Sequence, residues 1–90
     1  MNEANEAKTI TSKRGLKFLV KYDGDYVYIG LDHTLSRVGQ ICVYEAVKPL
    51  NLKCANRFVH LNGVYCPVFF IENYSIEEIE ETLKNYSQKP

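Results

Sequence analysis

The chain has 90 residues and a mass of 10.4 kDa, and its 11 basic and 11 acidic side chains give a formal net charge of zero. Apolar residues make up 46% of the sequence and aromatic residues 12%, which is typical of a folded soluble domain and not of a disordered tail. There is room for one domain, and no apolar run reaches the roughly 20 residues of a membrane span. These properties exclude a multidomain enzyme, a membrane span and a coiled-coil rod.

The neutral total conceals an uneven distribution of charge. Residues 1–57 carry nine basic side chains against six acidic ones, a balance of +3, and residues 58–90 carry two against five, a balance of −3. A basic half can attract phosphate groups. The excess is nevertheless small beside that of a dedicated DNA-binding protein, and ordinary surface charge explains it as well.

Three cysteines, Cys42, Cys54 and Cys66, stand at an even spacing of 12 residues. An odd number of cysteines without an export signal favours reduced thiols and a cytoplasmic location. A zinc site that included His33 or His60 would need ligand pairs closer together than this sequence contains. We therefore expect three small buried residues, and no cofactor that is required for folding.

Residues 1–14 are polar without a sustained period, so we expect a flexible N-terminal arm followed by a single domain over residues 15–90. The clearest local structure is a hairpin over residues 16–31. Its predicted loop is Asp23-Gly24, because both positions tolerate a positive φ, and this loop would pair Val20 with Val27. The hairpin then has an apolar face with Leu16, Phe18, Val20, Val27 and Ile29, and a second face with Lys17, Leu19, Lys21, Tyr26, Tyr28 and Gly30.

Residues 34–47 fit two structures. Thr34 can cap a helix that Pro49 would end, with a stripe at helical spacing. The members of that stripe are Leu35, Val38, Ile41, Cys42 and Ala46. Alternatively, Gly39 is a poor residue inside a helix, and residues 40–47 are rich enough in Ile, Val and Tyr to form a strand. We favour the helix.

A second hairpin is predicted around Asn62-Gly63, with residues 58–61 and 64–66 as its strands. Pro67 cannot donate to a ladder, so its strand should lie at a sheet edge or be bulged there. Residues 68–71 form a continuous apolar run that is suited to a buried strand.

The last element is a helix that begins at a capping box formed by Ser75 and Glu78. Its apolar stripe is Ile76, Ile79, Leu83 and Tyr86. Of its four glutamates only Glu80 borders this stripe, which aims it toward the body of the domain. The whole pattern predicts an α+β fold: a small antiparallel sheet of three to four strands, with one central and one C-terminal helix packed against it.

This order of elements, with Tyr28-Ile29-Gly30 at the end of the first hairpin, resembles a degenerate GIY-YIG nuclease domain. The resemblance covers residues 15–90, with Gly15-Leu16-Lys17 at the place of the first motif. It implies that Tyr28 acts near the nucleophile, that Arg37 contacts the phosphate and that Glu80 holds Mg²⁺ or Mn²⁺.

Two positions depart from the family pattern. Lys17 replaces the tyrosine of the first motif, and Arg37 lies one residue before the position of the family's arginine, which is Val38 here. One residue on a helix is a rotation of about 100°, so this shift can carry the guanidinium out of a site. The resemblance therefore implies a nucleic-acid-associated protein whose nuclease activity is doubtful.

Two functional hypotheses follow. The first is nucleic-acid binding, because lysines interleaved with aromatic rings suit a single strand. Its candidate residues are Lys17, Lys21, Tyr26, Tyr28 and Arg37. A winged-helix arrangement with Asn62-Gly63 at the wing tip is disfavoured, because the C-terminal helix is acidic.

The second hypothesis is a non-enzymatic protein-binding or inhibitory module, of the kind found among small bacterial or phage proteins. It would act through exposed tyrosines and strand edges, and the strand edges could also support oligomers. No membrane partner is expected.

Overall fold

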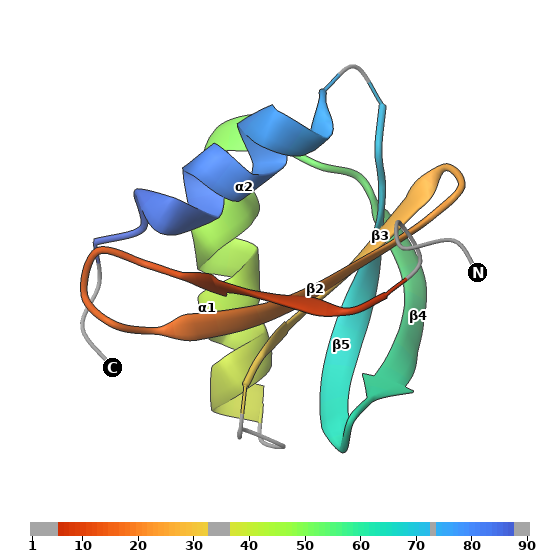
Figure 1. The fold of residues 1–90 in the computed structure, drawn as a ribbon. Coiled ribbons are helices and arrows are strands. Elements are labelled where there is room, and N and C mark those ends of the chain that lie inside the picture. Colours follow the sequence, from red (N-terminus) through yellow and green to blue (C-terminus); the bar gives the residue numbers. More distant parts are fainter. Residues whose placement is uncertain (1–5, 33–36, 73, 88–90) are drawn as a thin grey trace.

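The computed structural model describes residues 6–32, 37–72 and 74–87 (Figure 1). The elements in chain order are β1 (Lys8–Thr11), β2 (Lys17–Asp23), β3 (Tyr26–Leu31), α1 (Arg37–Val47), the short 3-10 helix η2 (Lys48–Leu50), β4 (Cys54–Leu61), β5 (Val64–Phe70) and α2 (Ile76–Lys84). The α+β class is confirmed, with one central and one C-terminal helix. The sheet has five strands, which is more than the three to four predicted.

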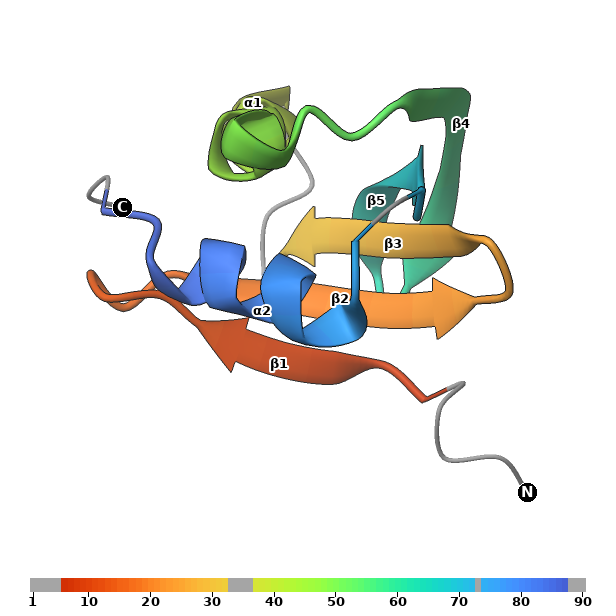
Figure 2. The same cartoon turned by 90° about the horizontal axis from the view of Figure 1, so that it is seen from above.

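The sheet is antiparallel with the strand order β1-β2-β3-β5-β4, so β1 and β4 are its edges. Helix α1 contacts β3 and β5, whereas α2 contacts β1, and the two helices also contact each other. Figure 2 shows α2 lying over the β1–β2 part of the sheet and β4 standing apart from both helices. No helix in the described part of the chain is long and apolar enough to cross a membrane.

Two hydrophobic clusters stabilise this arrangement, one on each face of the sheet. The main core lies between the sheet and the helices, and its most completely buried side chains are Phe18, Val20, Val27, Ile29, Val43, Phe69, Ile79 and Leu83. The second core lies on the face without helices and consists of Leu19, Tyr28, Val64, Cys66 and Val68. Partly buried residues of both edges, Ala7 beside β1 and Val59 on β4, pack against this second core. These residues from the two sides of the sheet help to bury the face that carries no helix.

The expected N-terminal arm is wrong for residues 8–11, which pair with β2 as β1. Only Ile10 of this strand is buried, so alternation over four residues gave no usable signal. The turn after β1 is fixed by Ser12, whose hydroxyl accepts a hydrogen bond of 3.1 Å from the Leu16 N–H. The edge of β2 that does not face β3 can accept another strand, and residues 8–11, which include three β-branched side chains, pair with it.

The first hairpin keeps its predicted faces but not its predicted register. Phe18 pairs with Leu31 and Asp23 with Tyr26, so the loop is Gly24-Asp25 and not Asp23-Gly24. Gly24 has φ of 60° at the first loop position, the place that a type II′ turn reserves for glycine. Because the shift changes the register by two residues, every side chain stays on its predicted face.

Residues 37–47 are helical, as favoured, and Thr34 and Leu35 lie outside the described residues. The predicted stripe is partly wrong. Ile41 is 59% exposed, and the buried side of α1 is formed by Gly39, Val43, Ala46 and Val47. In α2 the Ser75 cap is confirmed, since its hydroxyl accepts from the Glu78 N–H at 3.2 Å. The α2 stripe is confirmed at Ile79 and Leu83, but Ile76 is 42% exposed.

Pro67 lies in the interior strand β5, so the edge alternative is wrong. The irregularity beside it is a register shift in the partner strand β4, between Cys54 and Phe58, and not a bulge of the strand that contains Pro67. The Asn62-Gly63 loop is confirmed, with both residues at positive φ and Leu61 paired with Val64. Leu61 and Val64 flank a two-residue loop and so form a hydrogen-bonded pair, and the two kinds of pair alternate along the ladder. Phe58 and Pro67 are then a pair without hydrogen bonds, so the nitrogen of Pro67 faces β3 and not β4. The β3–β5 pairing ends one residue away, at Val68.

Candidate functional sites

Tyr28, the residue that the resemblance places near a nucleophile, is a buried member of the second core with 7% of its surface exposed. Its hydroxyl donates a hydrogen bond of 2.6 Å to Asp23 Oδ2. The hydrogen bond to this carboxylate, assisted by burial, raises the pKa of Tyr28. The phenol is therefore held neutral and is already committed to a neighbour on its own hairpin.

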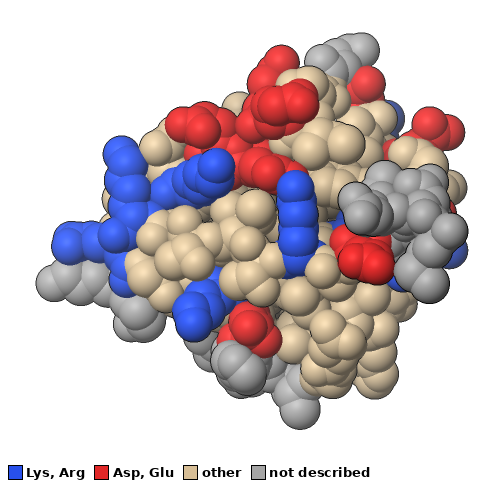
Figure 3. Space-filling view, in the orientation of Figure 1, with Lys and Arg blue, Asp and Glu red and all other residues tan. Residues whose placement is uncertain are grey.

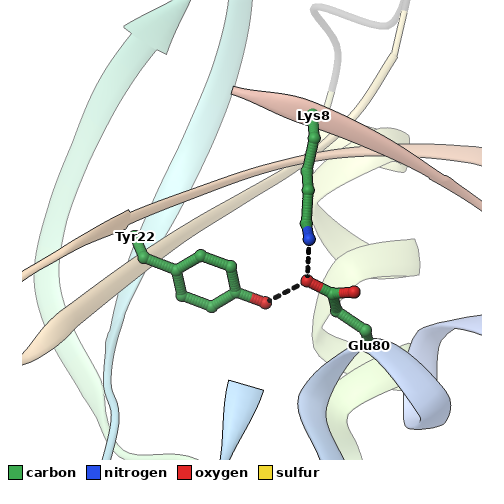
Figure 4. A network of polar contacts seen from close by, with 3 residues as sticks. All are labelled: Lys8, Tyr22 and Glu80. Carbon is green, nitrogen blue, oxygen red and sulfur yellow. Dashed lines mark hydrogen bonds and ion pairs between the residues drawn. The ribbon is translucent and has the colours of Figure 1, made fainter. Parts of the chain in front are cut away.

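Glu80, the candidate metal ligand, lies on α2 and faces the domain as predicted, with 15% of its side chain exposed. Its Oε2 atom accepts a hydrogen bond of 3.0 Å from the Tyr22 hydroxyl and forms an ion pair with Lys8 Nζ (Figure 4). Burial, reinforced by the charge of Glu80, raises the pKa of Tyr22 far above its ordinary range. This group joins β1, β2 and α2, and we call it the Glu80 clasp.

The structure does not bring Tyr28 and Glu80 together. Tyr28 belongs to the second core, whereas Tyr22, the partner of Glu80, belongs to the main core on the opposite face of the sheet. Arg37 is the first residue of α1, and its side chain lies outside the described part of the chain.

The carboxylate of Glu80 is already paired within the fold, which bears on its predicted role as a metal ligand. The described residues contain no group of three or more His, Cys, Asp or Glu side chains that could hold a metal ion. A Mg²⁺ or Mn²⁺ ion at Glu80 would have to displace the ammonium of Lys8, which is paired with the carboxylate.

Apart from Arg37, the predicted nucleic-acid contacts lie on the face of the second core but do not form a surface on which bases could stack. They are Lys17, Lys21, Tyr26 and Tyr28. Lys17 is exposed and Lys21 half-buried beside Tyr28 on the neighbouring strand. The ring of Tyr26 is covered from two directions, by Phe70 at 5.1 Å and by the Arg57 guanidinium at 4.9 Å from its centroid. These rings are occupied by packing, so bases cannot stack on them without rearrangement.

The structure instead reveals a cluster of exposed rings on the β4–β5 hairpin, which we call the aromatic edge: Phe58, His60 and Tyr65. Phe58 is 40% and Tyr65 41% exposed. The Tyr65 ring lies 5.3 Å from that of Phe58 and 4.5 Å from that of His60. The sequence contained this signal, since the correctly predicted Asn62-Gly63 loop already places all three rings on one face.

Helix α1 carries a further exposed ring. Tyr44, 38% exposed, packs its ring edge-on against Phe69 at 5.5 Å. Phe69 lies on the same face of β5 as Tyr65, because the two are four residues apart in one strand. Burial, with a contact to Cys54, raises the pKa of Tyr44 to about 12, so its hydroxyl stays neutral.

A second surface gathers basic side chains around the turn between β1 and β2. Exposed cations from this turn, the start of β2 and the end of α2 form what we call the basic end: Lys13, Arg14, Lys17 and Lys84. Figure 3 shows Lys and Arg gathered on the side where Figure 1 places this turn, and Asp and Glu gathered over α2. Sequence reasoning assigned only Lys17 to a binding surface, because the approach of α2 is a tertiary contact.

Comparison of the chain with protein-family models, with curated proteins and with solved structures found no match.

Proposed function

We propose that this protein is a binding module that accepts an extended segment of a partner protein as an additional strand along β4. The observation that carries the proposal is a sheet edge with exposed rings directly beside it, since β4 is the edge strand and the aromatic edge borders it. Strand addition of this kind obtains affinity from main-chain hydrogen bonds and specificity from neighbouring side chains.

The backbone of β4 is suited to this role. Leu61 and Val64 flank a two-residue loop, so they form a hydrogen-bonded pair, and the pairs of the ladder alternate from there. His60–Tyr65 and Phe58–Pro67 are then pairs without hydrogen bonds, in which the β4 member points its N–H and C=O away from β5. The N–H and C=O groups of Phe58 and His60 are thus directed toward an incoming strand.

The side chains of β4 support the same conclusion. Edge strands are commonly protected by charged residues, prolines or bulges. Residues 58–61 contain no acidic residue, no Lys or Arg and no proline, and the register shift of β4 lies before Phe58. This part of the edge therefore lacks these protections. Exposed aromatic residues are the side chains that most often dominate the energy of an interface. An incoming strand would cover the rings of Phe58 and Tyr65 while it pairs with the backbone.

The proposal places this module in the cytoplasm. Cys42, Cys54 and Cys66 are all free thiols, as a reducing compartment would leave them. Tyr28 and Glu80 have structural roles in it, since each is bonded within the fold.

The test is a selection of random linear peptides displayed on phage, followed by measurement of each selected peptide against variants. His60→Pro removes one N–H that faces the partner and leaves the ladder to β5 intact, because that N–H is not used there. We expect it and Phe58→Ser each to weaken binding by at least about tenfold, the loss of a typical interface hot spot. His60→Ala, which keeps the N–H, separates the effect of the ring from that of the backbone.

Ile76→Ser is the matched control, because Ile76 is 42% exposed on α2, far from the aromatic edge, and its loss should change nothing. Amide hydrogen exchange provides a second measurement: Phe58 and His60 should become protected when a peptide binds. Selected peptides that bind His60→Pro and wild type equally would refute strand addition. A concentration-dependent dimer abolished by His60→Pro would show that the occupant is a second copy, and would overturn the proposal of a foreign partner.

A further inference from the structure

We propose that the basic end binds the phosphate backbone of single-stranded nucleic acid, independently of the partner site on β4. Four cations meet there from segments far apart in the sequence: Lys13, Arg14, Lys17 and Lys84. In Figure 1 this end lies on the opposite side of the molecule from β4, so the two sites do not compete for space.

The fold holds these cations in place. The Lys13 N–H donates to the Lys84 carbonyl at 2.9 Å, and Arg14 Nε donates to the Ser87 carbonyl at 3.2 Å. The turn itself is closed by Ser12, which is 5% exposed and bonds to Leu16 through its hydroxyl. The backbone segments that carry the charges are therefore already held together before any ligand arrives, and the Arg14 guanidinium is held as well, which lowers the entropic cost of binding.

No described ion pair neutralises the basic end, since the ion pair that the described residues form joins Lys8 to Glu80. Of the acids of α2, Glu80 and Glu81 precede Lys84 by four and three residues, and Glu77 and Glu78 by at least six, about 9 Å along the helix. Glu80 is paired with Lys8, and Glu81 accepts a hydrogen bond from the Asn85 side chain. At about one Debye length in 0.1 M salt the repulsion from Glu77 and Glu78 is weakened, and Glu81 is the acid of α2 that opposes a phosphate at Lys84 most directly. The helix dipole favours a cation in the last turn of α2 and so explains why a lysine stands at position 84. It does not explain the lysine at position 17, which lies on β2.

The geometry favours a flexible single strand over a duplex or a membrane. Lys17 extends from the face of the second core, whereas Lys84 belongs to the helix on the other face, so the charges surround a convex turn. A single strand can bend around this turn, but a rigid duplex cannot follow it. The exposed large apolar residues of the described chain lie on α1, β4, β5 and the first turn of α2, so the basic end lacks the apolar anchor that lipid surfaces bind.

The test measures the binding of a fluorescent oligo-dT to the full chain by anisotropy across a salt series. Each neutralised phosphate contributes about 0.7 to the slope of log affinity against log salt concentration, so four contacts predict a slope near −2.8. Lys13→Ala/Arg14→Ala and Lys17→Ala/Lys84→Ala should each reduce the slope to about −1.4. Lys48→Ala/Lys53→Ala, which removes the same charge from another exposed surface, should leave the slope unchanged.

His60→Pro should bind oligo-dT as wild type does, which separates this inference from the fate of the partner site. The two double variants of the basic end remove different pairs of cations. A folding defect in one variant therefore cannot produce the expected decrease in slope in both. Equal losses in the basic-end and control doubles would show a general effect of net charge and overturn the proposal. Salt-independent binding, no binding, or stronger binding to anionic lipid vesicles than to oligo-dT would overturn it as well.

Discussion

Replacement of Gly30 by alanine should destabilise the fold through the second core. A Cβ atom at this position would lie 2.4 Å from Cys66 Sγ and 2.8 Å from Val64 Cγ1, where ordinary contacts are 3.4–4 Å. Both neighbours are buried, Cys66 at 0% and Val64 at 3% exposure, so neither can move into solvent. Overpacking of this kind costs about 1–3 kcal/mol in the free energy of unfolding. For a domain of this size, each 1 kcal/mol lowers Tm by about 4–8 °C.

The assay is thermal and urea unfolding followed by circular dichroism, with a double-mutant cycle that adds Cys66→Ala. Removal of Sγ eliminates the shorter of the two contacts, so the double variant should be more stable than the sum of the single effects predicts, by about 0.5–3 kcal/mol. Burial raises the pKa of the Cys66 thiol to about 11, so ionisation does not complicate the comparison at neutral pH. Wild-type stability in Gly30→Ala, or strictly additive effects in the cycle, would refute this account of the glycine.

Three further outcomes are expected. Tyr22→Phe should lower the free energy of unfolding by about 1.5–3 kcal/mol at neutral pH, the usual value of a hydrogen bond to a charged group. Because folding raises the pKa of Tyr22, this stabilisation is present below the ordinary tyrosine pKa of 10.0 and is lost above it, so urea titrations should show the two proteins converging at alkaline pH. Ser75→Ala should lower the free energy of unfolding by about 1 kcal/mol, because it removes the cap of α2. Ser87→Ala is the control: it keeps the backbone carbonyl that accepts from Arg14, so its free energy of unfolding should equal that of wild type. Plasmid incubated with the protein in Mg²⁺ or Mn²⁺ should remain uncut, and cleavage that both Glu80→Gln and Tyr28→Phe abolish would contradict the placement of these residues on opposite faces.

The Gly30 contact also gives a physical meaning to the tripeptide that suggested a nuclease. Tyr28, Ile29 and Gly30 each have a packing role: Tyr28 in the second core, Ile29 fully buried in the main core, and Gly30 beneath Cys66. Short motifs of this kind are read equally well as a strand that is buried on both faces. The resemblance to the GIY-YIG family remains a hypothesis from the sequence.

The candidate sites were less predictable than the elements, because they depend on contacts between distant segments. The orientation of Glu80 follows from its helical phase and was predicted. Its partners Lys8 and Tyr22 could not be, since one comes from a segment expected to be a flexible arm. The basic end has the same origin: Lys13 and Lys84 meet only because the β1–β2 turn packs against the end of α2.

The sequence by itself determined what depends on neighbouring residues: the Asn62-Gly63 loop, the Ser75 cap, and the faces of the first hairpin. Alternation along a strand and capping at a helix end involve only a few residues, so their signals remain legible in one chain. Tertiary structure alone decided that β1 joins the sheet and that β5 enters between β3 and β4. Which strands pair depends on which strand edges are free and on how much apolar surface of a whole sheet face each arrangement buries. Both depend on residues far apart in the sequence, so they are defined only in the folded chain.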